Sequence, residues 1–277
     1  MKIDSHQHFW KYDPIKEAWI TPEMAVIQKD FLPQDLKPLL SQNNFEGCIA
    51  VQADQSENET HFLLELAREN DFIKGVVGWV DFKAPNIEER LEYFSGFKKL
   101  KGFRHIFQAE PDPEFMLRND FCNGIGKLAK YNFTYDILIG AQQWPFVTPF
   151  IQKFPEQHFV LDHLAKPDFK KSDFTEFEKT IQSIAKNPNV CCKVSGLVTE
   201  AHWHNWKPDD FKTALDIVTQ NFGSDRLMFG SDWPVCLLSA NYSEVIALVE
   251  NYFTSFSTAD QKALWGNNAV SFYNLEV

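Results

Sequence analysis

Two histidines near the start of the chain, His6 and His8, are separated by a single residue. In a β-strand this spacing places both imidazoles on the same face. Two imidazoles that converge in this way can bind a metal ion or a polarised oxygen atom. A His-x-His pair is also common among packed and exposed histidines, so its meaning depends on whether it ends a strand.

Asp232 follows the apolar run 227–229 and precedes a Trp-Pro pair. A carboxylate at the end of a buried strand is unfavourable unless it is paired or used, which makes Asp232 a candidate general base. The alternative is an aspartate that only begins the turn before the proline.

In two pairs of neighbouring residues, only one side chain of each pair can face inward within a strand. Asp162 and His163 follow an apolar run, and neighbours in a strand point to opposite faces, so both cannot face inward unless the strand has ended. We favour His163. Arg104 and His105 pose the same choice, which the pattern leaves open. An inward Arg104 would suit a carboxylate or a developing oxyanion.

Other polar and aromatic residues would bind a substrate around these candidates. They are Gln52, His105, Asp136 and Lys166, with Lys193 as a further polar residue in a predicted strand. Trp203 and Trp206 would form a wall that stacks on a ring, together with Trp10 and Trp233, or would only anchor their loop. The pair His202-x-His204 lies in the same segment, where a loop would not hold two imidazoles in place.

These candidates lie at the ends of predicted strands. Short apolar runs alternate with longer stretches of helical periodicity along the chain. The predicted strands are 2–8, 47–52, 73–82, 100–108, 133–139, 158–163, 190–196 and 226–232. The predicted helices are 33–43, 57–70, 86–94, 113–131, 143–154, 173–187, 208–222, 242–253 and 258–272.

Strands that alternate with helices in 277 residues indicate an α/β fold, a single (β/α)8 TIM barrel with its active site at the C-terminal strand ends. A doubly wound sheet is the alternative, but it predicts a glycine-rich turn where the first strand ends in Gln7-His8. P-loop and G-x-S-x-G motifs are absent. No Gly-, Ser- or Pro-rich linker divides the chain, so we expect one domain spanning residues 1–277.

The composition restricts the function classes and the location. A net charge of −11 disfavours binding to nucleic acid or to an anionic membrane. There is no apolar run of about 18 residues and no signal-like N-terminus. Five cysteines without regular spacing argue against a disulfide framework and a four-cysteine zinc module. We therefore expect a cytoplasmic protein.

Together the motifs resemble the amidohydrolase superfamily of the amidohydrolase-2 type, and within it the L-fuconolactonase-like sugar-lactone hydrolases. The resemblance is carried by DSHQHFW, KGFRHIFQ, VLDHLAKP, KVSGLVTEAHWHNW, MFGSDWPV and WGNNAVSFYNL, which run from residue 4 to residue 275. It implies a barrel that hydrolyses its substrate with an activated water. By position, Asp232 would be the base, and His6, His8 and His163 would bind a metal or polarise a carbonyl.

One departure from the superfamily concerns the metal. Binuclear members use a bridging carboxylated lysine on the fourth strand or a replacement acid, whereas this strand has Lys101 at its beginning and Arg104-His105 at its end. We therefore expect one divalent ion at most, zinc from the ligand types, and a substrate as reactive as an ester does not make this ion chemically obligatory. No organic cofactor is expected. The metal ligands would be His6, His8, His163 and Asp232.

The leading hypothesis is hydrolysis of a neutral, polyhydroxylated sugar lactone, such as L-fuconolactone, to the sugar acid. Asp232 would act as the base, while His163 and Arg104 would stabilise the oxyanion. One rival is a metal-dependent decarboxylase or amide hydrolase on the same barrel. Another, of a different class, is a non-catalytic sugar-binding barrel. The exact lactone, the metal requirement and the oligomeric state stay open.

Overall fold

The computed structural model of the chain describes residues 1–276. Eight strands form one sheet in the order β1 to β8, and each pairs with the next in parallel. Their bounds are β1 Ile3–Gln7, β2 Gly47–Val51, β3 Ile73–Gly78, β4 Leu100–Ile106, β5 Thr134–Leu138, β6 Phe159–Leu161, β7 Val190–Val194 and β8 Leu227–Phe229. The predicted parallel barrel is confirmed.

The barrel closes just beyond the ends of β1 and β8. There the backbone N–H of His8 donates to the Trp233 carbonyl at 2.7 Å, and the N–H of Asp232 donates to the His6 carbonyl at 2.8 Å. The ring centroids of His6 and His163 are 4.4 Å apart. Closure therefore brings together residues from the two ends of the sequence, which an open doubly wound sheet would keep apart.

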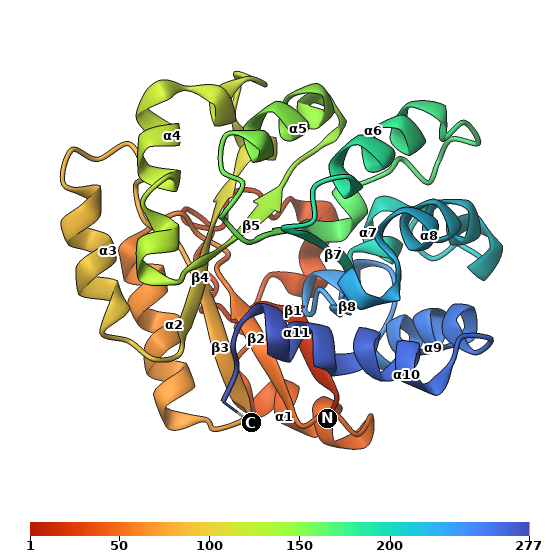
Figure 1. The fold of residues 1–277 in the computed structure, drawn as a ribbon. Coiled ribbons are helices and arrows are strands. Elements are labelled where there is room, and N and C mark those ends of the chain that lie inside the picture. The colour runs from red at the N-terminus through yellow and green to blue at the C-terminus, as the bar shows by residue number, and fades with distance from the viewer. Residues whose placement is uncertain (277) are drawn as a thin grey trace.

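Helices surround the strands (Figure 1). Their bounds are α1 Pro33–Gln42, α2 Glu57–Glu69, α3 Ile87–Ser95, α4 Asn119–Ile125, α5 Trp144–Gln152, α6 Thr175–Ala185, α7 Leu197–Glu200, α8 Pro208–Phe222, α9 Tyr242–Phe253, α10 Thr258–Lys262 and α11 Asn268–Phe272. The last helix contacts β1 and β8, and both chain termini lie on the same side of the molecule (Figure 1). The C-terminal segment thus covers the end of the barrel opposite the strand ends that carry the candidate residues.

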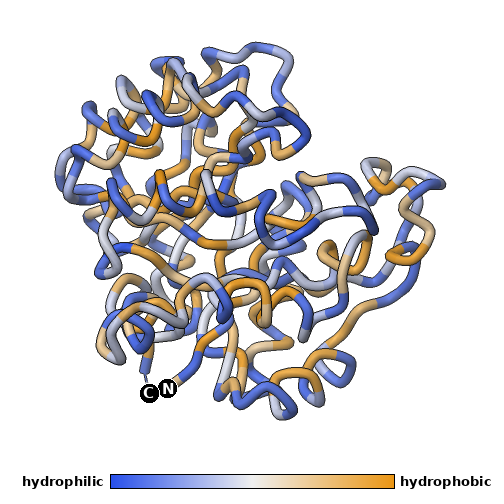
Figure 2. Tube along the Cα trace, turned by 90° about the vertical axis from the view of Figure 1, so that its right-hand side faces the viewer, coloured by the Kyte–Doolittle hydropathy of each residue, from blue (hydrophilic) through white to orange (hydrophobic). Residues whose placement is uncertain are grey.

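Two apolar clusters form the core. The larger fills the layer between strands and helices, and it includes Cys48 and Ala50 of β2. Strand alternation turns Ile49 and Val51 to the other face, into the lumen. There they pack with Ile3, Val77, Val160, Met228 and Tyr273. The lower lumen is therefore a packed core, and hydrophilic segments lie mainly on the outer turns (Figure 2).

Two features of the predicted elements are wrong. Several strands end early, because the chain leaves the ladder while its residues are still apolar; β3 ends at Gly78 instead of residue 82. The predicted helix 113–131 consists of a 3-10 turn, α4 and a second 3-10 turn. Gly124 and Gly126 lower its helix propensity. A side chain at position 124 would meet the Phe82 carbonyl oxygen at 2.3 Å, so close packing requires the glycine.

No helix among residues 1–276 combines the length and the apolar content needed to cross a bilayer. A cytoplasmic location and a single domain spanning residues 1–277 stay predictions.

Candidate active site

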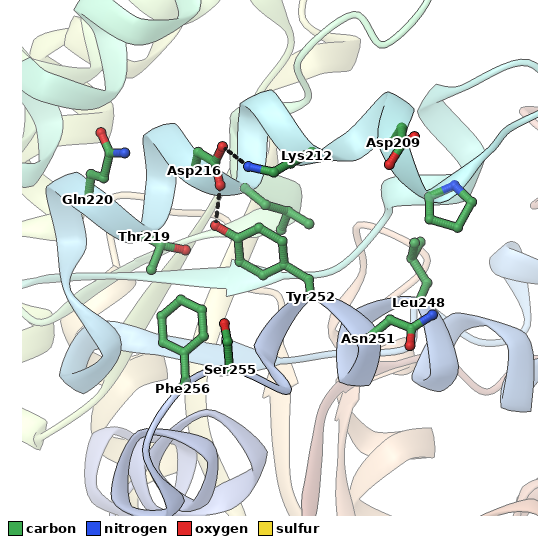
Figure 3. A pocket seen from close by; sticks show the side chains of 12 residues that line it. Asp209, Lys212, Asp216, Thr219, Gln220, Leu248, Asn251, Tyr252, Ser255 and Phe256 are labelled. Atoms are coloured by element: carbon green, nitrogen blue, oxygen red, sulfur yellow. Dashed lines mark hydrogen bonds and ion pairs between the residues drawn. The ribbon is translucent and has the colours of Figure 1, made fainter.

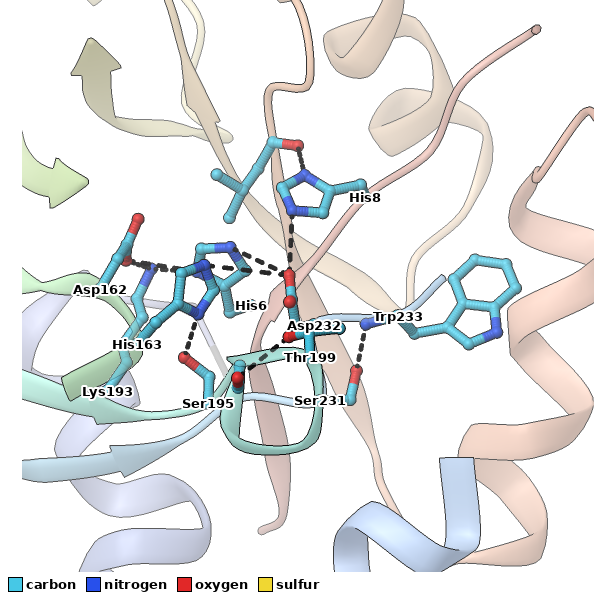
Figure 4. Close-up of polar contacts among 12 residues, drawn as sticks. His6, His8, Asp162, His163, Lys193, Ser195, Thr199, Ser231, Asp232 and Trp233 are labelled. Atoms are coloured by element: carbon cyan, nitrogen blue, oxygen red, sulfur yellow. Dashed lines mark hydrogen bonds and ion pairs between the residues drawn. The ribbon is translucent and has the colours of Figure 1, made fainter. Parts of the chain in front are cut away.

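The carboxylate of Asp232 lies among three imidazoles at the carboxyl ends of the strands (Figure 4). Its Oδ1 is 3.8 Å from His6 Nε2, 3.4 Å from His8 Nε2 and 3.9 Å from His163 Nε2. All four residues are buried. The structure thus brings the four predicted metal-binding or catalytic residues together, while their roles stay predictions.

The backbone turns after β6 and β8 produce this arrangement. Asp232 has a φ of 58°, and His163 has a φ of 53° at the start of a left-handed run that ends at Lys166. Residues with a Cβ adopt this region only when the surrounding contacts hold them there. Because β6 has already ended at Leu161, Asp162 also turns inward, and its Oδ1 lies 3.3 Å from His6 Nδ1.

Hydrogen bonding sets the tautomer of His8. Its Nδ1 lies 2.7 Å from the Val51 carbonyl oxygen, which can only accept, so Nδ1 carries the proton. In the neutral ring Nε2 then presents a lone pair to the Asp232 carboxylate, 3.4 Å away. Two acceptors that face each other need a cation or a proton donor between them. This point favours either a metal ion or a water molecule that donates to both.

The donor set fits one metal ion. One ligand atom from each of His6, His8 and Asp232 lies within 4.8 Å of the other two, and two imidazoles with one carboxylate form a typical zinc set. A second group with the same spacing consists of His6, Asp162 and His163. Because the two groups share His6, they do not provide two independent sites.

Two cations neutralise the carboxylates beneath the imidazoles. Arg104 donates to Asp162 at 3.1 Å, and its Nη1 also lies 3.3 Å from the Nε2 of His6. Lys193 lies 3.0 Å from Asp162 and 2.5 Å from Asp136. Asp162 is therefore already paired, which disfavours the second ligand group as a metal site.

Asp232 differs from these carboxylates in its partners. Within the described part of the chain, the basic side chains next to its carboxylate are all histidines. Burial lowers the pKa of His163 to about 4 and lowers that of His6 well below its usual range. Burial raises the pKa of Asp232, but the combined attraction of His163, His8 and His6 and the hydrogen bond to His8 outweigh this effect and hold the pKa well below its usual range. Near neutral pH the site therefore combines an ionised carboxylate with two neutral imidazoles.

A cavity of about 260 Å³ opens above Asp232. Its polar lining consists of His8, Arg104, Gln108, His163, Lys166 and Asp232, and its apolar lining of Trp10, Trp19, Ala53, Ile106, Ala109, Leu138 and Val235. The two indoles meet edge to face, with centroids 6.0 Å apart. Their N–H groups donate to the Lys29 carbonyl and to Glu17. Trp19 therefore presents carbon surface to a ligand, whereas Trp10 is fully buried behind it.

The structure places His105, which we predicted to bind substrate, outside the cavity. Its ring stacks on Phe115 with centroids 4.8 Å apart, and its Nε2 lies 2.7 Å from Glu110, in the layer outside the strands. Alternation along β4 is the reason, because Arg104 faces the lumen and its neighbour must then face the helices.

Gln52 and Asp136 lie below the cavity and do not line it. Gln52 accepts a hydrogen bond from Arg104 at 3.1 Å. Asp136 contacts Lys193 and accepts from the hydroxyl of Tyr273 at 2.9 Å. The two residues therefore hold the buried cations in place, whereas we predicted direct contact with substrate.

The predicted tryptophan wall has different members. Trp203 and Trp206 donate to the carbonyls of their own and a neighbouring loop and do not line the cavity, because their N–H groups anchor these loops. Trp233 packs against Phe31, with centroids 5.2 Å apart. Trp10 lines the cavity as predicted, and Lys166 does so while paired with Glu200 at 2.7 Å.

Sequence reasoning missed two residues of the site. Asp162 was set aside because the end of β6 at Leu161 leaves no mark in the apolar pattern. Trp19 lies in the long segment after β1, where no periodicity predicts which side chains turn back over the barrel. Its residue type, an aromatic ring in a loop that follows a strand, was the only available signal.

A second cavity lies outside the barrel between α8 and α9 (Figure 3). Lys212 donates to Asp216 at 2.6 Å, and the Tyr252 hydroxyl donates to the same carboxylate at 2.8 Å. These groups satisfy one another, and the cavity contains none of the predicted catalytic residues. The cavity above Asp232 is therefore the candidate active site.

Comparisons with known proteins agree with this geometry. Residues 3–275 match the family model described as Amidohydrolase. The chain is 42% identical to an L-fucono-1,5-lactonase of Burkholderia multivorans and 31% identical to one of Burkholderia ambifaria, each over 99% of this chain and 96% of the relative. The crystal structure of a Burkholderia multivorans amidohydrolase with bound zinc covers 100% of both chains, with a TM-score of 0.96 and 42% identity. The chain belongs to the amidohydrolase family, as its motifs indicated.

Proposed function

We propose that this protein is a hydrolase that opens a sugar lactone of the L-fucono-1,5-lactone type to the sugar acid. One observation carries the proposal: an ionised carboxylate, paired with no Lys or Arg of residues 1–276, lies among three imidazoles at the floor of a cavity. Such a group can accept a proton from water. The names of the two Burkholderia lactonases support the substrate class.

The positions of the side chains suggest the order of events. A water between His8 Nε2 and Asp232 donates one proton to each acceptor. As its oxygen attacks the lactone carbonyl carbon, Asp232 takes a proton. Arg104 and His163, which line the cavity, stabilise the oxyanion. The bond between the carbonyl carbon and the ring oxygen then breaks, and Asp232 returns the proton to the ring oxygen, which becomes a hydroxyl group.

For a bound metal ion we propose His6, His8 and Asp232 as the ligands. The zinc in the Burkholderia multivorans crystal structure supports this proposal. A divalent ion there would polarise the lactone carbonyl and lower the pKa of a bound water. Arg104 supplies a fixed positive charge 3.3 Å from the Nε2 of His6. We therefore propose that an ion assists the reaction without being required for it.

The cavity lining suggests how the sugar is recognised. Trp19 offers carbon surface for the apolar face of the ring, with the buried Trp10 packed against it, and Ile106 and Leu138 add a further apolar wall. This surface suits the methyl group of an L-fucono-lactone. The side chains of Gln108 and Lys166 would hydrogen-bond to hydroxyl groups, and an analogue without hydroxyls would not form these hydrogen bonds.

A pH-indicator assay tests the proposal, because ring opening releases a proton. We expect L-fucono-, L-galactono- and D-arabinono-lactones to have kcat/KM values at least about tenfold above that of γ-butyrolactone. Equal turnover of γ-butyrolactone, or reaction with amides alone, would contradict the sugar-lactonase assignment. Saturable binding without turnover would favour a sugar-binding barrel. Retained activity after chelation, with metal loss verified by elemental analysis, would count against a metal-dependent decarboxylase or amide hydrolase.

A further inference from the structure

Asp4 is a fully buried carboxylate that the reaction described above does not use. It precedes His6 by two residues, yet it faces the helix layer, because the register of β1 shifts between Asp4 and Gln7. Its Oδ2 accepts a hydrogen bond from the hydroxyl of Tyr242 in α9 at 3.0 Å. No basic side chain of residues 1–276 forms an ion pair with it, so four hydrogen bonds alone offset the cost of burying this group.

The donors to Asp4 come mainly from the two strand ends that close the barrel. Its Oδ1 accepts from the backbone N–H groups of His6 and Ser231, at 3.2 and 2.9 Å. Its Oδ2 accepts from the Ser231 hydroxyl at 2.6 Å. The same hydroxyl oxygen accepts from the N–H of Trp233 at 3.0 Å (Figure 4). Asp4 is thus bonded to the residue before Asp232 directly and to the residue after it through Ser231.

Asp232 lies between these two residues, and its backbone conformation is one that neighbouring contacts must stabilise. Asp232 has a φ of 58°, and a left-handed backbone is unfavourable for a residue with a Cβ unless its neighbours are held. The two strands also approach closely here, since a side chain at Gly230 would meet the Cβ of His6 at 2.5 Å. Both the turn and the approach depend on contacts across the junction of β1 and β8.

We propose that Asp4 is a positioning residue for the catalytic carboxylate. Through Ser231 it holds the turn that directs Asp232 toward the imidazoles and the cavity, while it does not itself contact the substrate. This inference rests on the proposed role of Asp232 in lactone opening. The proposal predicts that loss of the hydrogen bond from Ser231 lowers the catalytic rate more than loss of the hydrogen bond from Tyr242.

A matched pair of variants tests this prediction. Ser231→Ala and Tyr242→Phe each remove one hydroxyl donor to the Oδ2 of Asp4, but only Ser231 belongs to the turn that carries Asp232. We expect Ser231→Ala to lower kcat about tenfold or more with KM within about twofold, and Tyr242→Phe to leave both within about twofold. Melting temperatures show whether both variants lose a comparable amount of stability. Equal losses of kcat in the two variants, or no loss in either, would overturn the proposal.

Variants at Asp4 itself provide a rescue test. In Asp4→Asn the amide oxygen still accepts from two backbone N–H groups, and the amide nitrogen donates to the two hydroxyls. We expect this variant to keep most of its kcat and Asp4→Ala to lose about tenfold or more. If Asp4→Ala does not fold, the comparison of kcat between Ser231→Ala and Tyr242→Phe tests the proposal by itself. The parent protein and Asp232→Asn separate the two proposals: a parent without lactone turnover refutes the proposed function, and an active Asp232→Asn refutes the role of Asp232. An inactive Asp232→Asn with equal Ser231 and Tyr242 variants refutes only the positioning role.

Discussion

The two ends of the barrel lumen are built from opposite kinds of residue. Toward the amino ends of the strands, apolar side chains such as Ile49, Val77 and Met228 fill the lumen on regular strands. Toward the carboxyl ends, buried charges and left-handed residues such as His163 and Asp232 replace them. Buried charge and backbone strain reduce stability, so they persist where they serve a function. Substitutions at the two ends should therefore change different properties.

The largest expected effect is that of Asp232→Asn at the carboxyl end. The side chain keeps its shape but loses its ability to accept a proton, so kcat should fall by about a hundredfold or more. Because the amide fills the same space, the protein should stay folded, with a modest fall in melting temperature from the loss of a charge that the fold stabilises. Lactone turnover and calorimetry measure the two quantities. A variant that keeps more than about a tenth of its kcat would remove Asp232 from the mechanism.

The opposite pattern is expected for Ile49→Ala at the amino end. This side chain is fully buried in the lower lumen, so its truncation should reduce the free energy of unfolding by about 2–5 kcal/mol. Ile49→Val should cost about 0.5–1.5 kcal/mol at the same position. Urea unfolding measures both. At a temperature where the variants are folded, kcat should match that of the parent, and a parallel loss of kcat would show that the two ends are not separable.

The sequence was sufficient to predict the amino end of the lumen and the scaffold. All eight strands were predicted because apolar runs and alternation mark them directly. The residues around Asp232 were also recognised, since His6, His163 and Asp232 each end such a run. Burial pattern and site position therefore come from the same periodic signal, which holds as long as the backbone stays extended.

The signal fails where the backbone leaves the strand. The left-handed turns at His163 and Asp232 change the direction of side chains, so alternation wrongly set Asp162 aside. The register shift in β1 likewise hid Asp4, which shares the spacing of His6 but faces the other way. The choice between Arg104 and His105 depended on the register of β4 in the closed barrel. These features are set by tertiary contacts, not by local propensity.

A smaller effect is expected at the rim of the carboxyl end, where Trp19 lines the cavity. Trp19→Ala removes carbon surface from the proposed sugar site, so KM should rise about tenfold while kcat stays within about twofold. Trp19→Phe should lie between the parent and this variant. Trp203→Ala is the matched control, because its indole anchors a loop away from the cavity. Similar KM values in the Trp19 and Trp203 variants would show that aromatic contact at the rim does not select the sugar.

The smallest expected effect is the absence of a pH response between about pH 5 and 8. Burial lowers the pKa of His163 to about 4, and that of Asp232 is held well below its usual range, so both keep the form needed for catalysis across this window. As the pH falls through about 4, His163 becomes protonated and pairs with the Asp232 carboxylate, which weakens this base, so kcat/KM should fall. Burial also raises the pKa values of Asp4 and Asp136 to about 6, inside the window, but neither residue lines the cavity. A protonated Asp4 retains oxygen atoms that accept hydrogen bonds, so its titration should leave the rate unchanged.

Initial rates corrected for spontaneous lactone opening measure the pH profile. A step near pH 6 would show that the charge of the carboxylates below the site, and not only their hydrogen bonding, controls the reaction.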